Sequence, residues 1–91
     1  MVILLVGLRL SHDTNKTQTL SFLKSACQRR KTKTEVDTYF GKPTRCSALD
    51  GEMHCTYYKS ISLPDRWTIE IVFDSELRVK QANAEGRLFT R

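Results

Sequence analysis

The 91-residue chain has little glycine and proline, and these shortages exclude several classes of protein. Four Gly and two Pro rule out collagen-like and low-complexity chains. Hydrophobic residues still make up 40% of the chain, which excludes disorder throughout. A chain of this length forms one domain with a thin core and little room for a deep cleft. We therefore expect a single domain over residues 1–91.

Recognisable catalytic and metal-binding patterns are also missing. There is no Gly-rich phosphate loop, no His-Glu-x-x-His pair and no calcium loop. Neither His12 nor His54 is spaced from a cysteine as zinc ligands are, and Cys-x-x-Cys is absent. Ser47 and His54 are expected to face each other across a hairpin, but no carboxylate is placed to orient the imidazole. We predict a protein that is not an enzyme and uses no cofactor or metal.

Positive charge exceeds negative charge, with 15 Lys and Arg against 10 Asp and Glu, so the formal net charge is +5. A positive field favours nucleic acid, anionic lipid or an acidic protein as partner. The one dense cluster of positive charge consists of Arg29, Arg30, Lys31 and Lys33. No aromatic residue interleaves with it, as a platform for stacking single-stranded nucleic acid would require. The simpler interpretation is a cationic helix C-terminus, and the alternative is a site that binds an anionic surface.

The first ten residues are apolar apart from Arg9. They are fewer than the ~20 residues that a membrane-spanning helix needs. A basic leading region and a clear cleavage site, typical of a signal peptide, are missing. Three interpretations remain open for residues 1–10: a buried strand, a degenerate or truncated export signal, or a misassigned start of the chain. Membrane association therefore stays open.

Two helices are predicted before the strands begin. After a polar break at residues 11–15, Leu20, Leu23 and Cys27 repeat with helical spacing, which predicts an amphipathic helix of about four turns ending near Arg30.

A second, shorter helix is predicted over residues 34–40. Thr32 and Glu35 have the spacing of a capping box, which marks its start. Gly41 can adopt the positive φ that ends a helix, and Pro43 prevents its continuation.

A tight hairpin is predicted at Asp50-Gly51, a dipeptide favoured in two-residue type I′ turns. This turn fixes the register and places Cys46 opposite Cys55 in a non-hydrogen-bonded pair, where the Cα atoms are close enough for a disulfide. The bond requires an oxidising compartment, and two reduced thiols are the alternative. Cys27 is then left as a buried helix residue.

Alternating residues predict two further strands, at 67–73 and 77–81, with Trp67 and Leu77 facing inward. Residues 60–65 are expected to form a loop, and residues 84–91 a frayed tail. Helices followed by strands indicate an α+β fold. We expect two N-terminal helices on one face of a three- to four-stranded antiparallel meander.

Neighbouring strand residues point to opposite sides, so either Tyr57 or Tyr58 must face outward, where tyrosine is a good contact residue. Outward cations near the strand meander add to this candidate surface. The predicted partner-binding residues are Tyr57, Tyr58, Arg66, Arg78 and Lys80.

Several short motifs resemble the SmpA/OmlA-type small outer-membrane lipoproteins, a family that includes a component of the β-barrel assembly machinery. The similar segments are residues 32–36, 40–43, 57–58, 69–74 and 77–79, within the stretch from Thr32 to Ala82. The family's Gly-Met before the first segment is replaced by Arg30-Lys31, and residues 23–27 do not form a proper lipobox. The resemblance implies a two-helix, antiparallel-sheet domain, also seen in β-lactamase-inhibitor proteins, that binds proteins or envelope components without catalysis.

These observations predict a protein-binding module of the periplasm or cell envelope, with a protein as its partner. The alternative is a small basic protein that binds nucleic acid or an anionic surface, for which a cytoplasmic location is also open.

Overall fold

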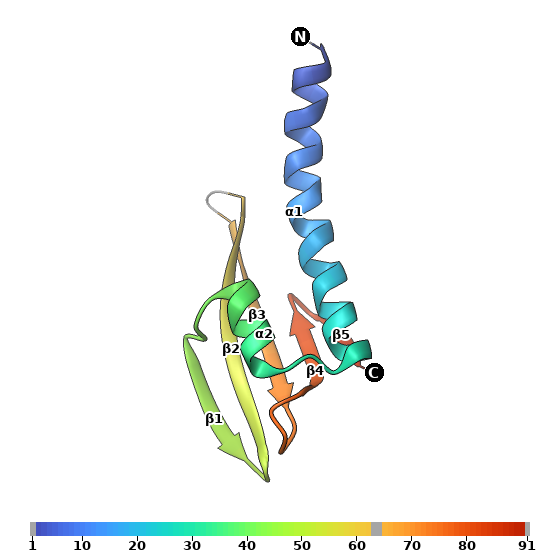
Figure 1. Cartoon of the computed structure of the whole chain (residues 1–91). Coiled ribbons are helices and arrows are strands. Elements are labelled where there is room, and N and C mark those ends of the chain that lie inside the picture. The colour runs from blue at the N-terminus through green and yellow to red at the C-terminus, as the bar shows by residue number, and fades with distance from the viewer. Residues whose placement is uncertain (1, 63–64, 91) are drawn as a thin grey trace.

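The computed structural model describes residues 2–62 and 65–90 and has an α+β fold, as expected (Figure 1). Two helices precede five antiparallel strands, one more than the upper limit of the prediction. The strands follow each other in a simple meander, in the order β1-β2-β3-β4-β5. The elements are α1 (Val2–Arg29), α2 (Lys33–Phe40), β1 (Arg45–Leu49), β2 (Glu52–Ser62), β3 (Asp65–Phe73), β4 (Val79–Ala84) and β5 (Arg87–Thr90).

Helix α1 is 28 residues long and passes without interruption through the predicted break at residues 11–15. A strand, one of the three interpretations left open for residues 1–10, is therefore wrong over residues 2–10. A strand needs a neighbour for its backbone N–H and C=O groups, whereas a helix satisfies these groups internally. The N-terminal part of α1 extends beyond the sheet, where no strand is in reach (Figure 1). Within residues 2–62 and 65–90, neither helix contains an apolar stretch of the length that a membrane-spanning helix needs.

The C-terminal half of α1 is amphipathic as predicted and ends at Arg29. Leu23, Ala26 and Cys27 are fully buried and join the core, whereas the opposite side is exposed at Lys16, Gln18, Lys24, Gln28 and Arg29. This stripe packs against β2, β4 and β5. Burial of apolar area against the sheet therefore fixes this half of the helix.

Helix α2 begins and ends as its sequence predicts. The Thr32 hydroxyl accepts the backbone N–H of Glu35 at 3.3 Å. At the other end Gly41 has a φ of +87° and donates its N–H to the carbonyl of Asp37 at 2.7 Å. Val36 is completely buried, while Tyr39 and Phe40 are half-buried.

The hairpin of β1 and β2 has the predicted register, with Cys46 opposite Cys55. The two cysteines form a disulfide, and their Cα atoms lie 4.1 Å apart. Asp50 and Gly51 both have positive φ, at 53° and 80°, as a type I′ turn requires. The turn dipeptide alone therefore determined which residues pair.

The strands extend further than predicted on both sides of the β2–β3 connection. Most of the predicted loop at residues 60–65 belongs to β2 and β3, and residues 63–64 lie outside the described part. Ile69, Ile71 and Phe73 are fully buried, and Trp67 packs against them from the edge of the core. A long ladder continues through polar residues because its backbone pairing does not depend on their side chains.

The turn before β4 differs from the prediction at Leu77. Its φ is +60° and its side chain is 42% exposed, so it does not face inward. Its N–H bonds to the carbonyl of Asp74 at 2.9 Å, and β4 begins only at Val79. Turn geometry therefore overrides the alternating pattern at this position.

The predicted frayed tail contains strand β5, which pairs with β4. Glu85 and Gly86 form a second turn with positive φ at both residues, at 50° and 81°. Phe89 packs against the core, and its carbonyl accepts the Cys27 thiol at 3.4 Å. The core contact of Phe89 and the turn at Glu85-Gly86 together hold β5 beside β4.

Candidate binding surface

The helices cover one face of the sheet and leave the other uncovered. Both helices pack on the face that holds Cys55, Tyr57, Ile69 and Ile71. Strand residues alternate between faces, so their neighbours point to the opposite side. We call that side the open face; on β2, β3 and β4 it comprises His54, Thr56, Tyr58, Arg66, Thr68, Glu70, Val72, Gln81 and Asn83.

A shallow depression of about 180 Å³ lies on the open face, between β2, β3 and β4. Across it, Thr56 pairs with Glu70 and Glu70 with Asn83 in neighbouring strands. His54 Nε2 lies 3.7 Å from Glu52 Oε1 and has no hydrogen-bond partner among the described residues. The depression therefore offers hydroxyl, amide and carboxylate groups of Thr56, Glu70, Gln81 and Asn83 for hydrogen bonding.

Tyr58 and Arg66 form an exposed pair at one end of the open face. The Arg66 guanidinium carbon lies 4.4 Å from the centre of the Tyr58 ring, a cation–π arrangement. The Tyr58 side chain is 39% exposed, and Arg66 is exposed as well. Tyrosine and arginine are the residue types enriched at interaction hot spots. The fold therefore brings two of the predicted binding residues, Tyr58 and Arg66, together on an exposed surface.

Tyr57 is the inward member of the tyrosine pair and is removed from the candidate surface. It is fully buried, and its hydroxyl donates to Asp37 Oδ1 of α2 at 2.6 Å. Burial, followed by this hydrogen bond and the charge of Asp37, raises the pKa of Tyr57 well above its ordinary value. Its role is to attach α2 to the sheet.

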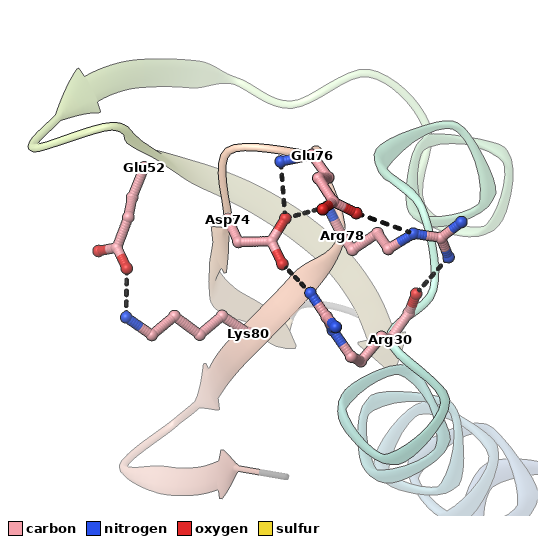
Figure 2. A network of polar contacts seen from close by, with 6 residues as sticks. All are labelled: Arg30, Glu52, Asp74, Glu76, Arg78 and Lys80. Atoms are coloured by element: carbon pink, nitrogen blue, oxygen red, sulfur yellow. Dashed lines mark hydrogen bonds and ion pairs between the residues drawn. The ribbon is translucent and has the colours of Figure 1, made fainter.

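Arg78 and Lys80 lie at the other end of the sheet and belong to a polar network (Figure 2). Arg78 Nη1 donates to the carbonyl of Arg30 at 3.1 Å, and Lys80 forms an ion pair with Glu52. Tyr58 is six residues along β2 from Glu52, which is roughly 20 Å in an extended strand. The five predicted binding residues therefore do not form one surface.

Asp74 is the centre of this network. Its Oδ1 accepts the backbone N–H groups of Glu76 at 2.9 Å and Arg78 at 3.1 Å, and its other oxygen pairs with Arg30. These contacts, the Arg78 N–H foremost, lower the pKa of Asp74. The network joins the end of α1 to the β3–β4 turn. Two backbone hydrogen bonds strengthen the junction, Lys33 N–H to the Leu77 carbonyl at 2.9 Å and Val79 N–H to the Lys31 carbonyl at 2.8 Å.

This geometry predicts a loss of stability in acid. A carboxyl whose pKa is lowered by folding stabilises the fold at pH values above its unfolded pKa, about 3.9 for Asp. That contribution is lost as the pH falls through the lower, folded pKa. Asp74→Asn keeps an oxygen for the two N–H groups and removes the charge facing Arg30. We expect this variant to melt at a lower temperature than the wild type at pH 7, and the difference to shrink as the pH falls below about 4.

Thermal unfolding followed by circular dichroism from pH 2 to pH 7 measures this effect. Glu70→Gln is the matched control, because Glu70 is exposed on the open face without an ion pair among the described residues. The control should keep the wild-type pH profile. A constant difference between Asp74→Asn and the wild type at every pH would contradict the assignment.

Most of the basic cluster at the end of α1 is compensated within the chain. Arg30 pairs with Asp74, Lys31 with Glu35 at 3.5 Å, and Lys33 with Asp37 at 2.8 Å. Lys31 also lies over the Phe22 ring, 5.8 Å from its centre. Because three of its four cations are paired within the chain, the cluster makes a weaker anionic-surface site than its sequence indicates. Arg29 alone has no ion pair within the described part of the chain.

Other reactive groups are sparse. Among the described residues, no three His, Cys, Asp or Glu side chains are close enough together to hold a metal ion. The free cysteine, Cys27, is buried, and desolvation raises the pKa of its thiol. A pocket of about 450 Å³ beside the network is open and lined by charged residues that already pair with each other, including Arg30, Glu52, Asp74 and Lys80.

No family model matches this chain, and neither the curated proteins nor the solved structures contain a significant match.

Proposed function

We propose that this protein is a non-catalytic binding module that engages a protein partner through the open face of its sheet. The observation that carries this proposal is the exposed pair of Tyr58 and Arg66 at the end of the polar depression. A tyrosine ring supplies a large contact area at low entropic cost, and the guanidinium supplies fixed donors beside it. The depression adds hydrogen-bonding groups around this pair, as in the polar rim of an interface.

The disulfide supports a location in the periplasm or cell envelope. Cys46 is exposed, so its bond to Cys55 would be open to reduction in the cytosol. Disulfides persist in oxidising compartments such as the bacterial periplasm. The order of two helices and an antiparallel sheet also agrees with the resemblance to the SmpA/OmlA-type lipoproteins. We therefore propose an envelope protein that binds another envelope component.

Replacing the exposed pair should abolish partner capture without unfolding the protein. In cells that produce the protein naturally, the tagged full chain with Tyr58→Ala or Arg66→Ala should retain at most a tenth of the wild-type partner. Truncating a hot-spot residue typically costs at least 2 kcal/mol of binding free energy, about thirtyfold in affinity, which is more than this loss requires. Quantitative mass spectrometry of the captured proteins measures the loss.

Arg87→Ala is the matched control, because Arg87 is an exposed arginine on β5, away from the pair. This variant should capture as much partner as the wild type. All three variants should unfold within about 1 kcal/mol of the wild type, as surface substitutions do. Undiminished capture by both Tyr58→Ala and Arg66→Ala would show that the partner binds elsewhere.

A further inference from the structure

Strand β1 forms an uncovered edge of the sheet. All five of its residues are exposed, and it pairs only with β2 among the described residues. The opposite edge, β5, is four residues long, and α1 packs against it. In Figure 1 β1 lies at the outer border of the sheet, on the side away from α1. The edge at β1 is therefore the one that another strand can reach.

The hairpin register shows which backbone groups face outward. Leu49 and Glu52 flank a two-residue turn and form a hydrogen-bonded pair, and such pairs alternate with non-hydrogen-bonded ones along the ladder. Arg45, Ser47 and Leu49 therefore direct their N–H and C=O groups toward β2. Cys46 and Ala48 direct theirs away from the sheet. This leaves two N–H and two C=O groups that an added strand can pair.

Natural proteins usually protect such an edge with charged side chains, lysine above all, or with proline, a bulge or a covering segment. The β1 strand contains neither lysine nor proline, its one charged residue is Arg45 at its first position, and its register with β2 is regular. Its residues bury no side chain in the core, yet the disulfide from Cys46 to Cys55 holds it to β2. The edge is therefore both exposed and held in place, as a template for strand pairing needs to be.

We propose that a second copy of this chain pairs with β1 in antiparallel orientation, about a twofold axis at Ser47. In this register Cys46 lies opposite Ala48 of the second copy, and the reverse pair forms by symmetry. All four outward backbone groups on each copy then find partners. The small side chains of Cys46, Ser47 and Ala48 leave room for the second strand, and the two sheets join into one.

The charges of β1 also fit a second copy. Arg45 lies opposite Leu49 of the second copy, so its aliphatic stem can cover a leucine that is 58% exposed in the single chain. The two Arg45 residues are then about 13 Å apart along the ladder, beyond a Debye length of about 8 Å at physiological salt. No like charges of β1 face each other in this register. The edge is therefore self-complementary, without requiring Tyr58 or Arg66.

Analytical ultracentrifugation of the full chain, from about 10 µM to 1 mM, tests this proposal. We expect a monomer–dimer equilibrium, weak because a single strand pair buries little area. Ala48→Pro removes one outward N–H and places the proline ring where the second strand would lie. Proline is tolerated on an edge strand when its nitrogen faces solvent, so the monomer should keep its circular dichroism spectrum. The dimer dissociation constant should rise at least tenfold, whereas Ala48→Val should leave it within threefold.

A charge exchange tests the register independently. Leu49→Arg places a cation opposite Arg45 of the second copy and should raise the dissociation constant at least fivefold. Adding Arg45→Glu to this variant creates two opposite-charge pairs and should restore dimerisation. A wild type that stays monomeric up to 1 mM would overturn the proposal and leave an extended segment of another protein as the candidate for this edge. A dimer that survives Ala48→Pro would overturn it as well.

Discussion

Tyr57→Ala is expected to lower the free energy of unfolding by about 3–5 kcal/mol, the range for removing a large buried aromatic side chain. Tyr57 is among the largest fully buried side chains of the protein. Its ring lies 5.7 Å from that of Phe40, and its hydroxyl contacts Asp37 of the same helix. The substitution therefore removes core volume and the main polar contact between α2 and the sheet. Small domains have only about 5–15 kcal/mol of stability, so the loss is a large share of the total.

Tyr57→Phe separates the hydrogen bond from the packing. The ring stays, and Asp37 loses a donor at 2.6 Å, although Lys33 remains beside it at 2.8 Å. A hydrogen bond to a charged group is worth about 1.5–3 kcal/mol, so this variant should fall between the wild type and Tyr57→Ala. Urea unfolding followed by Trp67 fluorescence at pH 7 gives all three values.

Tyr58→Phe is the matched control for the tyrosine pair. It removes the same hydroxyl from the neighbouring residue, whose side chain faces outward. Its free energy of unfolding should stay within about 0.5 kcal/mol of the wild type. If Tyr57→Phe and Tyr58→Phe were equally stable, the contact with Asp37 would not attach α2 to the sheet.

Features that depend on short-range rules could be predicted from the sequence. The turn at Asp50-Gly51 set the pairing of β1 with β2 and brought Cys46 to Cys55. The capping residue Thr32 and the terminating Gly41 set the limits of α2. In each case one or two residues impose a backbone geometry that few other residue types adopt easily.

Features that depend on the surroundings of a segment could not be predicted in this way. An apolar run such as residues 2–10 is compatible with strand or helix, and the outcome depends on whether a partner strand is near. Leu77 follows the alternating pattern but lies in a turn organised by Asp74. Strand β5 carries one core side chain, Phe89, which is too weak a signal by itself. The turn at Glu85-Gly86 was the one feature that could have indicated a hairpin of β4 and β5.

The candidate surface likewise combines features that short-range rules predict with features that depend on the surrounding fold. Alternation predicted that one of Tyr57 and Tyr58 faces outward, but only the position of the helices shows that it is Tyr58. Arg66 was predicted as an outward cation, and its place over the Tyr58 ring follows from the pairing of β2 with β3. Arg78 and Lys80 are partly exposed but take part in contacts with Arg30 and Glu52, because the β3–β4 turn lies beside the end of α1.

Removing the disulfide by Cys46→Ala is expected to lower the free energy of unfolding by about 2–3 kcal/mol, the entropic effect of opening a loop of this short length. The bond joins residues nine positions apart. For a domain of this size the melting temperature should fall by roughly 10–20 °C. Because β1 buries no side chain, its amide hydrogens should also exchange faster than those of β2 and β3.

The thermal unfolding of wild type and variant, with and without a reductant, tests this expectation. Reductant should lower the melting temperature of the wild type to that of Cys46→Ala and leave the variant unchanged. Ser47→Ala, at the exposed neighbouring position, should match the oxidised wild type. A wild type insensitive to reductant would show that the β-ladder alone holds β1. If the disulfide holds the edge as we infer, reduction should also weaken self-association, since a loosened strand must be ordered again before it can pair.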